Sequence, residues 1–200
     1  PYIPGSSIKG KMRSLLEIAH GYIVEVNMGR VKYGGSSESS LITAQLFGTA
    51  RGNDQQRPSK VIVRDGALIN TKQFEESDFY YTETKTEVVI DRITSAAMPR
   101  KMERVPAGAK FSLGVVLNVF EGDDEKGLLD AIFKSLQLVQ DDYLGGHGSR
   151  GSGQVDIVIN QVLEKDYDKL MKRTQSRPLP TERLSKSESL TFAAIIGLVG

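Results

Sequence analysis

Two stretches of the chain repeat apolar residues at helical spacing. The first follows the turn-forming Pro4-Gly5-Ser6-Ser7 and runs to about Ala19, and the second runs from Leu128 to Val139. Residues three and four positions apart share one face of a helix, so each stretch predicts an amphipathic helix. A serine before the first apolar residue is a common helix cap, and we expect Ser7 to end the turn in that role.

Strand-like runs lie between and after these helices. Residues 22–26, 61–63, 80–90, 111–119 and 154–159 are rich in β-branched and aromatic side chains and predict strands. Residues 91–104 place four cations around Ala96-Ala97-Met98-Pro99. We expect a basic hairpin with an apolar tip there. Such a tip can wedge between bases while its arms follow phosphates, although a surface hairpin with unrelated charges fits the same residues.

The predicted order is helix, strands, strand, helix, strand, which is a βαββαβ ferredoxin-like pattern without its first strand. That strand would lie in the middle of the sheet. The chain begins at Pro1 without an initiator methionine, and we expect natural residues to precede it. Alternatively another segment fills the gap, and the small, apolar residues 190–199 are the internal candidate. The fold class expected is therefore α+β, with the first strand missing or supplied from elsewhere.

Composition narrows the function classes only slightly. The 200 residues carry a formal net charge of +1, so bulk charge does not indicate nucleic-acid binding. The chain has no cysteine, which excludes disulfides, thiolate zinc sites and a catalytic thiol. No apolar run approaches the ~20 residues of a membrane span, so we expect no membrane span and no membrane partner. The compartment expected is the cytoplasm, with which the absence of cysteine is compatible.

Local charge is more informative than the total. Lys9, Lys11 and Arg13 crowd the first turns of the first predicted helix without an anion. Cations at a helix N-terminus oppose the helix dipole, and a bound anion would reverse that penalty. The pattern favours an anion site, and a solvated basic face is the alternative.

A glycine-rich stretch separates the second predicted helix from the last strand. Five of the nine residues from Gly145 to Gly153 are glycine, and Arg150 lies among them. Successive N–H groups without side chains can cradle an anion, and a guanidinium adds a fork of donors suited to phosphate. A tight helix-to-strand connection would need the same glycines. His147 has no second histidine nearby, so we interpret it as a ligand contact or an exposed residue and not as an acid or base.

Several motifs together resemble one family. Residues 3–13 (Ile-Pro-Gly-Ser-Ser-Ile-Lys-Gly-Lys-Met-Arg) resemble the first-helix motif of the RAMP superfamily, closest to the repeated backbone subunit of type III-A CRISPR effector complexes. Tyr81-Thr82-Glu83-Thr84-Lys85 with Asp91-Arg92, Pro99-Arg100 and Glu103-Arg104-Val105 resembles that subunit's thumb. The stretch 142–153 resembles its glycine-rich loop, and Leu46-Phe47-Gly48 also recurs there. The resemblance covers about residues 1–160.

The resemblance implies an RRM-like fold and a filament of identical subunits along a guide RNA, with a thumb that crosses the guide–target duplex and displaces a base. It implies four kinds of partner: the guide (CRISPR) RNA, target single-stranded RNA, further copies of the chain, and other type III effector subunits. The residues it places on RNA are Ser6, Ser7, Lys9, Lys11, Arg13, Arg92, Arg100, Arg104, Gly146, His147, Gly148, Ser149 and Arg150.

The family's endonuclease chemistry is implied only in part. In the family, a divalent metal such as Mg²⁺ and an aspartate upstream of the first-helix motif cut target RNA, and no matching loop is found in this chain. We therefore name no catalytic residue and no tightly bound cofactor; Asp65 and Asp91 are available carboxylates without a motif. Two alternatives stay open: a guide-binding paralogue without nuclease activity, and a small phosphate- or nucleotide-binding enzyme built on residues 145–153.

Two units are expected along the chain. Residues 1–160 would form the RRM-like domain, with the thumb at about 91–104. Residues 161–200 would form a C-terminal extension with a linker at Arg177-Pro178-Leu179-Pro180 and an apolar tail.

Overall fold

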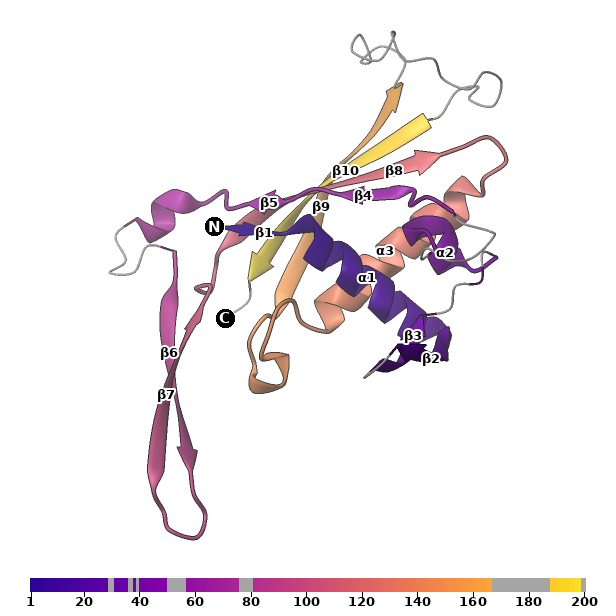
Figure 1. The fold of residues 1–200 in the computed structure, drawn as a ribbon. Coiled ribbons are helices and arrows are strands. Elements are labelled where there is room, and N and C mark those ends of the chain that lie inside the picture. The colour runs from indigo at the N-terminus through magenta and orange to yellow at the C-terminus, as the bar shows by residue number, and fades with distance from the viewer. Residues whose placement is uncertain are drawn as a thin grey trace.

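The computed structural model describes residues 1–28, 31–35, 38, 40–49, 57–75, 81–166 and 188–198. Helices cover one face of a central sheet, and a long hairpin projects away from the body (Figure 1). The helical elements are α1 (Gly5–His20), α2 (Ile42–Phe47), η1 (Thr71–Phe74), α3 (Glu125–Asp141) and η2 (Gly148–Arg150). The strands are β1 (Tyr2–Ile3), β2 (Ile23–Met28), β3 (Val31–Gly35), β4 (Val61–Val63), β5 (Gly66–Ala67), β6 (Glu83–Ile90), β7 (Ala97–Arg104), β8 (Lys110–Val119), β9 (Val155–Asp166) and β10 (Glu188–Leu198).

The central sheet has the strand order β4-β8-β10-β9, and every neighbouring pair is antiparallel. β10 pairs with β8 from Glu188 to Gly197 and with β9 from Glu188 to Leu198. This is the place and direction of the first strand in a ferredoxin-like sheet. The expectation that residues 190–199 fill the gap is confirmed for residues 190–198. The α+β, ferredoxin-like fold class is confirmed with it.

The two predicted amphipathic helices are confirmed, and both lie on the sheet. α1 buries Ile8, Met12 and Leu16 completely, at intervals of four residues. These side chains join the core cluster formed by α3 and by the buried face of β8. Alternate residues of β8 from Phe111 to Val119 are buried, and Val116 between them is buried as well.

The expected domain boundary at residue 160 falls inside β9, which continues to Asp166. The expected linker at residues 177–180 lies outside the described residues.

The start of α1 differs from the expectation. The helix begins at Gly5, so Ser6 and Ser7 lie in its first turn and neither caps it. Instead the Gly5 N–H donates to Asp65 Oδ1 at 2.8 Å, from the turn between β4 and β5. A carboxylate at this position favours the helix dipole. The prediction of a serine cap was wrong because a residue distant in the sequence supplies the acceptor.

The tip of the long hairpin also differs. β6 and β7 pair in register from Glu83↔Arg104 to Ile90↔Ala97, so the arm begins well before residue 91. Ala97, Met98 and Pro99 belong to β7, and the tip is the turn between Ile90 and Ala97. Asp91 fixes that turn by accepting hydrogen bonds from the N–H groups of Ile93 at 2.7 Å and Thr94 at 3.2 Å. These backbone hydrogen bonds lower the pKa of Asp91.

The glycine-rich segment 145–153 connects α3 to β9, as expected, and is held against the end of the helix. The Leu144 N–H donates to the Gly153 carbonyl at 2.8 Å, which closes the loop. A Cβ on Gly148 would lie 2.0 Å from the Tyr143 ring, whereas a Cβ on Gly146 would meet nothing within 4 Å. Glycine is therefore required by packing at residue 148 and not at residue 146.

We expect Thr191→Pro to lower the free energy of unfolding by about 3 kcal/mol or more, because proline donates no hydrogen bond in a strand paired on both sides. Thr191 lies opposite Val116 of β8 and Leu163 of β9. Denaturant unfolding measures the change. Thr191→Val keeps the backbone donor and is the matched control. Equal stability of the two variants would place β10 outside the sheet.

We expect Gly148→Ala to lower the free energy of unfolding by about 1–3 kcal/mol, because the new methyl group overlaps the Tyr143 ring. Gly146→Ala, two residues away in the same loop, should change it by less than about 0.5 kcal/mol. Both values come from the same denaturant titration. A larger loss at residue 146 would contradict the packing described for the loop.

Candidate nucleic-acid interface

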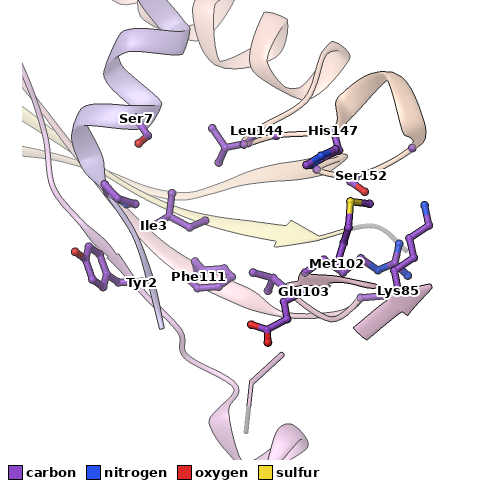
Figure 2. Close-up of a pocket in the computed structure, with 18 residues that line it drawn as sticks. Tyr2, Ile3, Ser7, Lys85, Met102, Glu103, Phe111, Leu144, His147 and Ser152 are labelled. Atoms are coloured by element: carbon purple, nitrogen blue, oxygen red, sulfur yellow. The ribbon is translucent and has the colours of Figure 1, made fainter. Parts of the chain in front are cut away.

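A cavity of about 350 Å³ lies where the N-terminus, the root of the long hairpin and the glycine-rich loop meet. Figure 2 shows Tyr2, Ile3 and Ser7 on one side, and His147 and Ser152 of the loop near Met102 and Lys85 of the hairpin. The floor includes Phe111, which is 1% exposed and forms a small core cluster with Phe74 and Ala109. The cavity thus has apolar walls and a polar mouth.

The loop presents its polar groups in an unusual backbone conformation. His147 has a φ of 63°, in the left-handed region, and is followed by the single turn of η2. Histidine tolerates this region better than most residues. The Arg150 and Ser152 N–H groups both donate to the His147 carbonyl, at 2.9 and 3.3 Å. His147 is exposed and lines the cavity, and its role as a ligand contact stays a prediction.

Lys11 joins α1 to the start of the loop. Its Nζ lies 2.5 Å from Asp142 Oδ2 and 4.1 Å from the centre of the Tyr143 ring. The side chain is 24% exposed. A cation over an aromatic face keeps favourable electrostatics while part of it faces solvent. Lys11 is therefore fixed beside the loop and open on one side.

Lys9 has a different environment from Lys11, although both are on α1. Its Nζ donates to Ser59 Oγ at 2.7 Å and to the Val61 carbonyl at 2.8 Å. Desolvation and then the charge of Arg13 lower the pKa of Lys9. These contacts bind the helix to β4. Lys9 is engaged by the protein itself in this structure.

Arg13 lies one helical turn after Lys9 and forms an ion pair with Glu17, at 2.8 Å from Nε to Oε1. Ser6 and Ser7 are exposed in the first turn, and Ser7 lines the cavity. The three cations of α1 thus do not form one cluster: Lys11 alone contacts the start of the loop.

The cations of the hairpin also lie in two different places. Arg104 at the root pairs with Glu83 and lines the cavity. Arg92 and Arg100 are exposed further out along the arm, and no ion pair joins them to another described residue. The root cation belongs to the cavity, whereas the outer cations are available to a ligand that follows the arm.

Arg150 of the loop meets β6 beside the cavity, at the lining residue Lys85. Arg150 Nη1 lies 3.4 Å from Glu87 Oε2, Lys85 Nζ lies 3.3 Å from Glu87 Oε1, and Lys85 also donates to the Arg150 carbonyl at 3.2 Å. Lys85, Glu87, Tyr143 and Met102 were not among the residues predicted for the site. The alternation of charge at residues 83, 85 and 87 could have revealed the first two, since it places all three on one side of the strand.

The described residues contain no group of three or more His, Asp or Glu side chains that could hold a metal ion. They therefore do not fit the divalent metal that the resemblance implies, and no chemical step is assigned to such an ion here. No helix within the described ranges is both long and apolar enough to cross a membrane.

Two groups of known proteins are similar to different parts of the chain. Residues 147–200 match the UbiA prenyltransferase family, and a protoheme IX farnesyltransferase of Flavobacterium psychrophilum is 36% identical over 72 residues, 36% of this chain and 22% of that protein. This second similarity includes β10 and covers too little of either chain to show a family.

The other similarity covers most of the chain. The RAMP superfamily model matches residues 1–156. "CRISPR system Cms endoribonuclease Csm3" of Enterococcus italicus is 37% identical over 172 residues, 84% of this chain and 77% of that protein. The protein of the same name from Methanocaldococcus jannaschii is 38% identical over 192 residues, 94% and 75% respectively. The chain belongs to the RAMP superfamily and, within it, to the Csm3 family of CRISPR systems.

Proposed function

We propose that this chain is a guide-RNA-binding backbone subunit of a type III CRISPR effector, and that it positions target RNA for cleavage. The observation that carries the proposal is the convergence of α1, the glycine-rich loop and the hairpin root on one cavity, in a chain of the Csm3 family. Two cations of the hairpin root, Lys85 and Arg104, line this cavity. Arg150 of the loop contacts Lys85, and Lys11 of α1 contacts Asp142 and Tyr143 just before the loop.

Binding by such a surface depends on the RNA backbone and not on its bases. A subunit that repeats along a guide must accept every sequence, and phosphate contacts carry no sequence information. Lys11 contacts Asp142 and Tyr143 just before the loop, Arg150 belongs to the loop, and both cations are partly exposed. They are the cations that we assign to guide phosphates. Lys9 is not assigned to a guide phosphate. Its hydrogen bonds to Ser59 and Val61 position α1, and it affects guide binding only in that way.

The cavity suits a base displaced from the strand. Its walls include Met102, Phe111 and Leu144, and its mouth carries His147 and Ser152. Apolar and aromatic surfaces hold unstacked bases without preference for sequence. The outer hairpin cations Arg92 and Arg100 would then follow the phosphates of the guide–target duplex as the arm crosses it.

Cleavage of target RNA is the part of the proposal that rests on the relatives, whose printed name is endoribonuclease. That name favours a nuclease over the purely structural paralogue. Asp65 and Asp91 both accept backbone hydrogen bonds, from Gly5 and from Ile93 and Thr94. We assign neither of them to catalysis.

We expect Lys11→Ala and Arg150→Ala each to weaken binding of single-stranded RNA by about three- to tenfold, whatever its sequence. Each should also lower the slope of log affinity against log salt by about one, because one phosphate contact is lost. Fluorescence anisotropy over a salt series measures both quantities. Lys126→Ala removes an exposed cation from the first turn of α3 and is the control. An equal effect of all three variants would show that only net charge matters.

For cleavage, we expect a complex assembled from this chain, a guide and the other effector subunits to cut complementary RNA. Asp65→Asn and Asp91→Asn should each keep the cleavage rate within about threefold, because an amide oxygen still accepts the backbone hydrogen bonds. Gel analysis of end-labelled target gives the rates. Loss of cleavage in one variant, with guide binding intact, would make that aspartate catalytic and contradict the assignment.

A further inference from the structure

A carboxylate lies inside the surface assigned to phosphate. Glu87 follows Lys85 on the same side of β6, and its two oxygens lie 3.3 Å from Lys85 Nζ and 3.4 Å from Arg150 Nη1. The Glu87 side chain is 20% exposed, so solvent still reaches it. A negative charge next to a phosphate-binding guanidinium weakens binding of a simple anion. Its presence there needs a reason.

Stability does not supply that reason. Arg150 is 50% exposed, and its separation from Glu87 is long for an ion pair between a guanidinium and a carboxylate. Exposed pairs of this kind contribute little to folding. The hairpin is held at its root by the Arg104–Glu83 pair and by the core cluster around Phe111. The Glu87 contact is thus not required to position the arm.

The chemistry of Glu87 suits a hydroxyl donor. Desolvation raises the pKa of its carboxyl group, but the Lys85 hydrogen bond and the charges of Lys85, Arg150 and His147 outweigh it, and the pKa is lowered. An ionised carboxylate accepts hydrogen bonds and donates none, and each oxygen has two lone pairs. After Lys85 and Arg150, acceptor positions remain. Arg150 likewise keeps donors for a phosphate, because a guanidinium has five.

A ribonucleotide strand carries both complementary groups. Its phosphate can bind the free donors of Arg150, and its 2′-hydroxyl can donate to Glu87. DNA offers the phosphate without the hydroxyl, and the 2′-hydroxyl is the group by which proteins distinguish the two nucleic acids at a given site. The carboxylate then repels a deoxyribose strand and is compensated by a ribose strand.

We propose that Glu87 is a specificity-determining residue that accepts a ribose 2′-hydroxyl beside the phosphate held by Arg150, and so makes this site prefer RNA to DNA. The inference rests on the proposed RNA-binding function and adds the selection of sugar to it. It assigns Glu87 a role in recognition and none in cleavage.

The test uses the ratio of affinities for RNA and for DNA of the same sequence. Labelled single strands of each are titrated with the full chain at one low salt concentration, and anisotropy gives both dissociation constants. We expect the unmodified chain to prefer RNA, and Glu87→Ala to lower the RNA-to-DNA ratio by about tenfold or more, since one hydrogen bond to a charged acceptor is lost. Glu87→Gln should keep the ratio within about twofold, because its amide oxygen still accepts.

Two further titrations separate this role from a general charge effect. Asp130→Asn removes one negative charge from an exposed position on α3, with roughly 17 Å of helix between it and the loop, and should leave the ratio unchanged. RNA with 2′-O-methyl groups cannot donate and should bind the unmodified chain as DNA does.

The outcomes distinguish the two proposals. Tighter binding of RNA and DNA by the same factor in both Glu87 variants would make Glu87 a simple electrostatic mask and overturn the inference. Equal affinity of the unmodified chain for RNA and DNA would overturn it as well, with RNA binding itself retained. Absence of RNA binding by the unmodified chain would overturn the proposed function and this inference together.

Discussion

The pairing of β10 with both β8 and β9 is the constraint on which the rest of the structure depends. β8 supplies the buried residues that receive α1 and α3, and β9 begins two residues after the glycine-rich loop. Neither strand pairs with the other, because β10 lies between them. The ladder therefore fixes the distance between the hairpin root, which continues into β8, and the loop, which continues into β9. The cavity lies between these two ends, so the pairing of β10 sets its width.

Much of this arrangement could be predicted from the sequence, because the informative patterns are local. The apolar stripes of α1 and α3 and the β-rich run of β8 indicate their own structures. The gap in the sheet was predictable from element order alone, and residues 190–199 were the apolar segment left to fill it. The predictions of the serine cap and of the hairpin tip were wrong for the same reason. Each depends on an aspartate, Asp65 or Asp91, whose side chain accepts backbone hydrogen bonds that no periodic pattern reveals.

In the candidate site too, residue spacing predicts the position of the cations on α1, whereas packing determines which partners they contact. Lys9, Lys11 and Arg13 are successive odd positions, so on a helix Lys9 and Arg13 share a side and Lys11 faces away from it. Spacing thus separates Lys11 from the other two cations, but it does not reveal the partner of any of them. In the structure, Lys9 donates hydrogen bonds to Ser59 and Val61. Arg13 forms an ion pair with Glu17, and of the three cations only Lys11 contacts the residues that lead into the loop. The partners that distinguish the three cations lie on other elements, except for Glu17. Charge density at the start of a helix therefore predicts a binding surface, but it does not predict the separate environments of the cations within that surface.

The sequence similarities to the two families overlap in the glycine-rich loop and at the start of β9. The RAMP match ends at residue 156, just inside β9, whereas β10 lies within the stretch similar to prenyltransferases. A sheet can accept such a strand because its ladder is made by backbone groups, which every residue but proline supplies in full. The slot between β8 and β9 requires an extended, mainly apolar segment of about this length that lacks proline, and residues 188–198 meet that requirement. The RNA binding proposed for residues 1–156 thus depends on β10 through its backbone pairing with β8 and β9. The strand and the proposed RNA-binding residues have separate roles, since no contact described above for Lys11, Lys85, Glu87 or Arg150 involves β10.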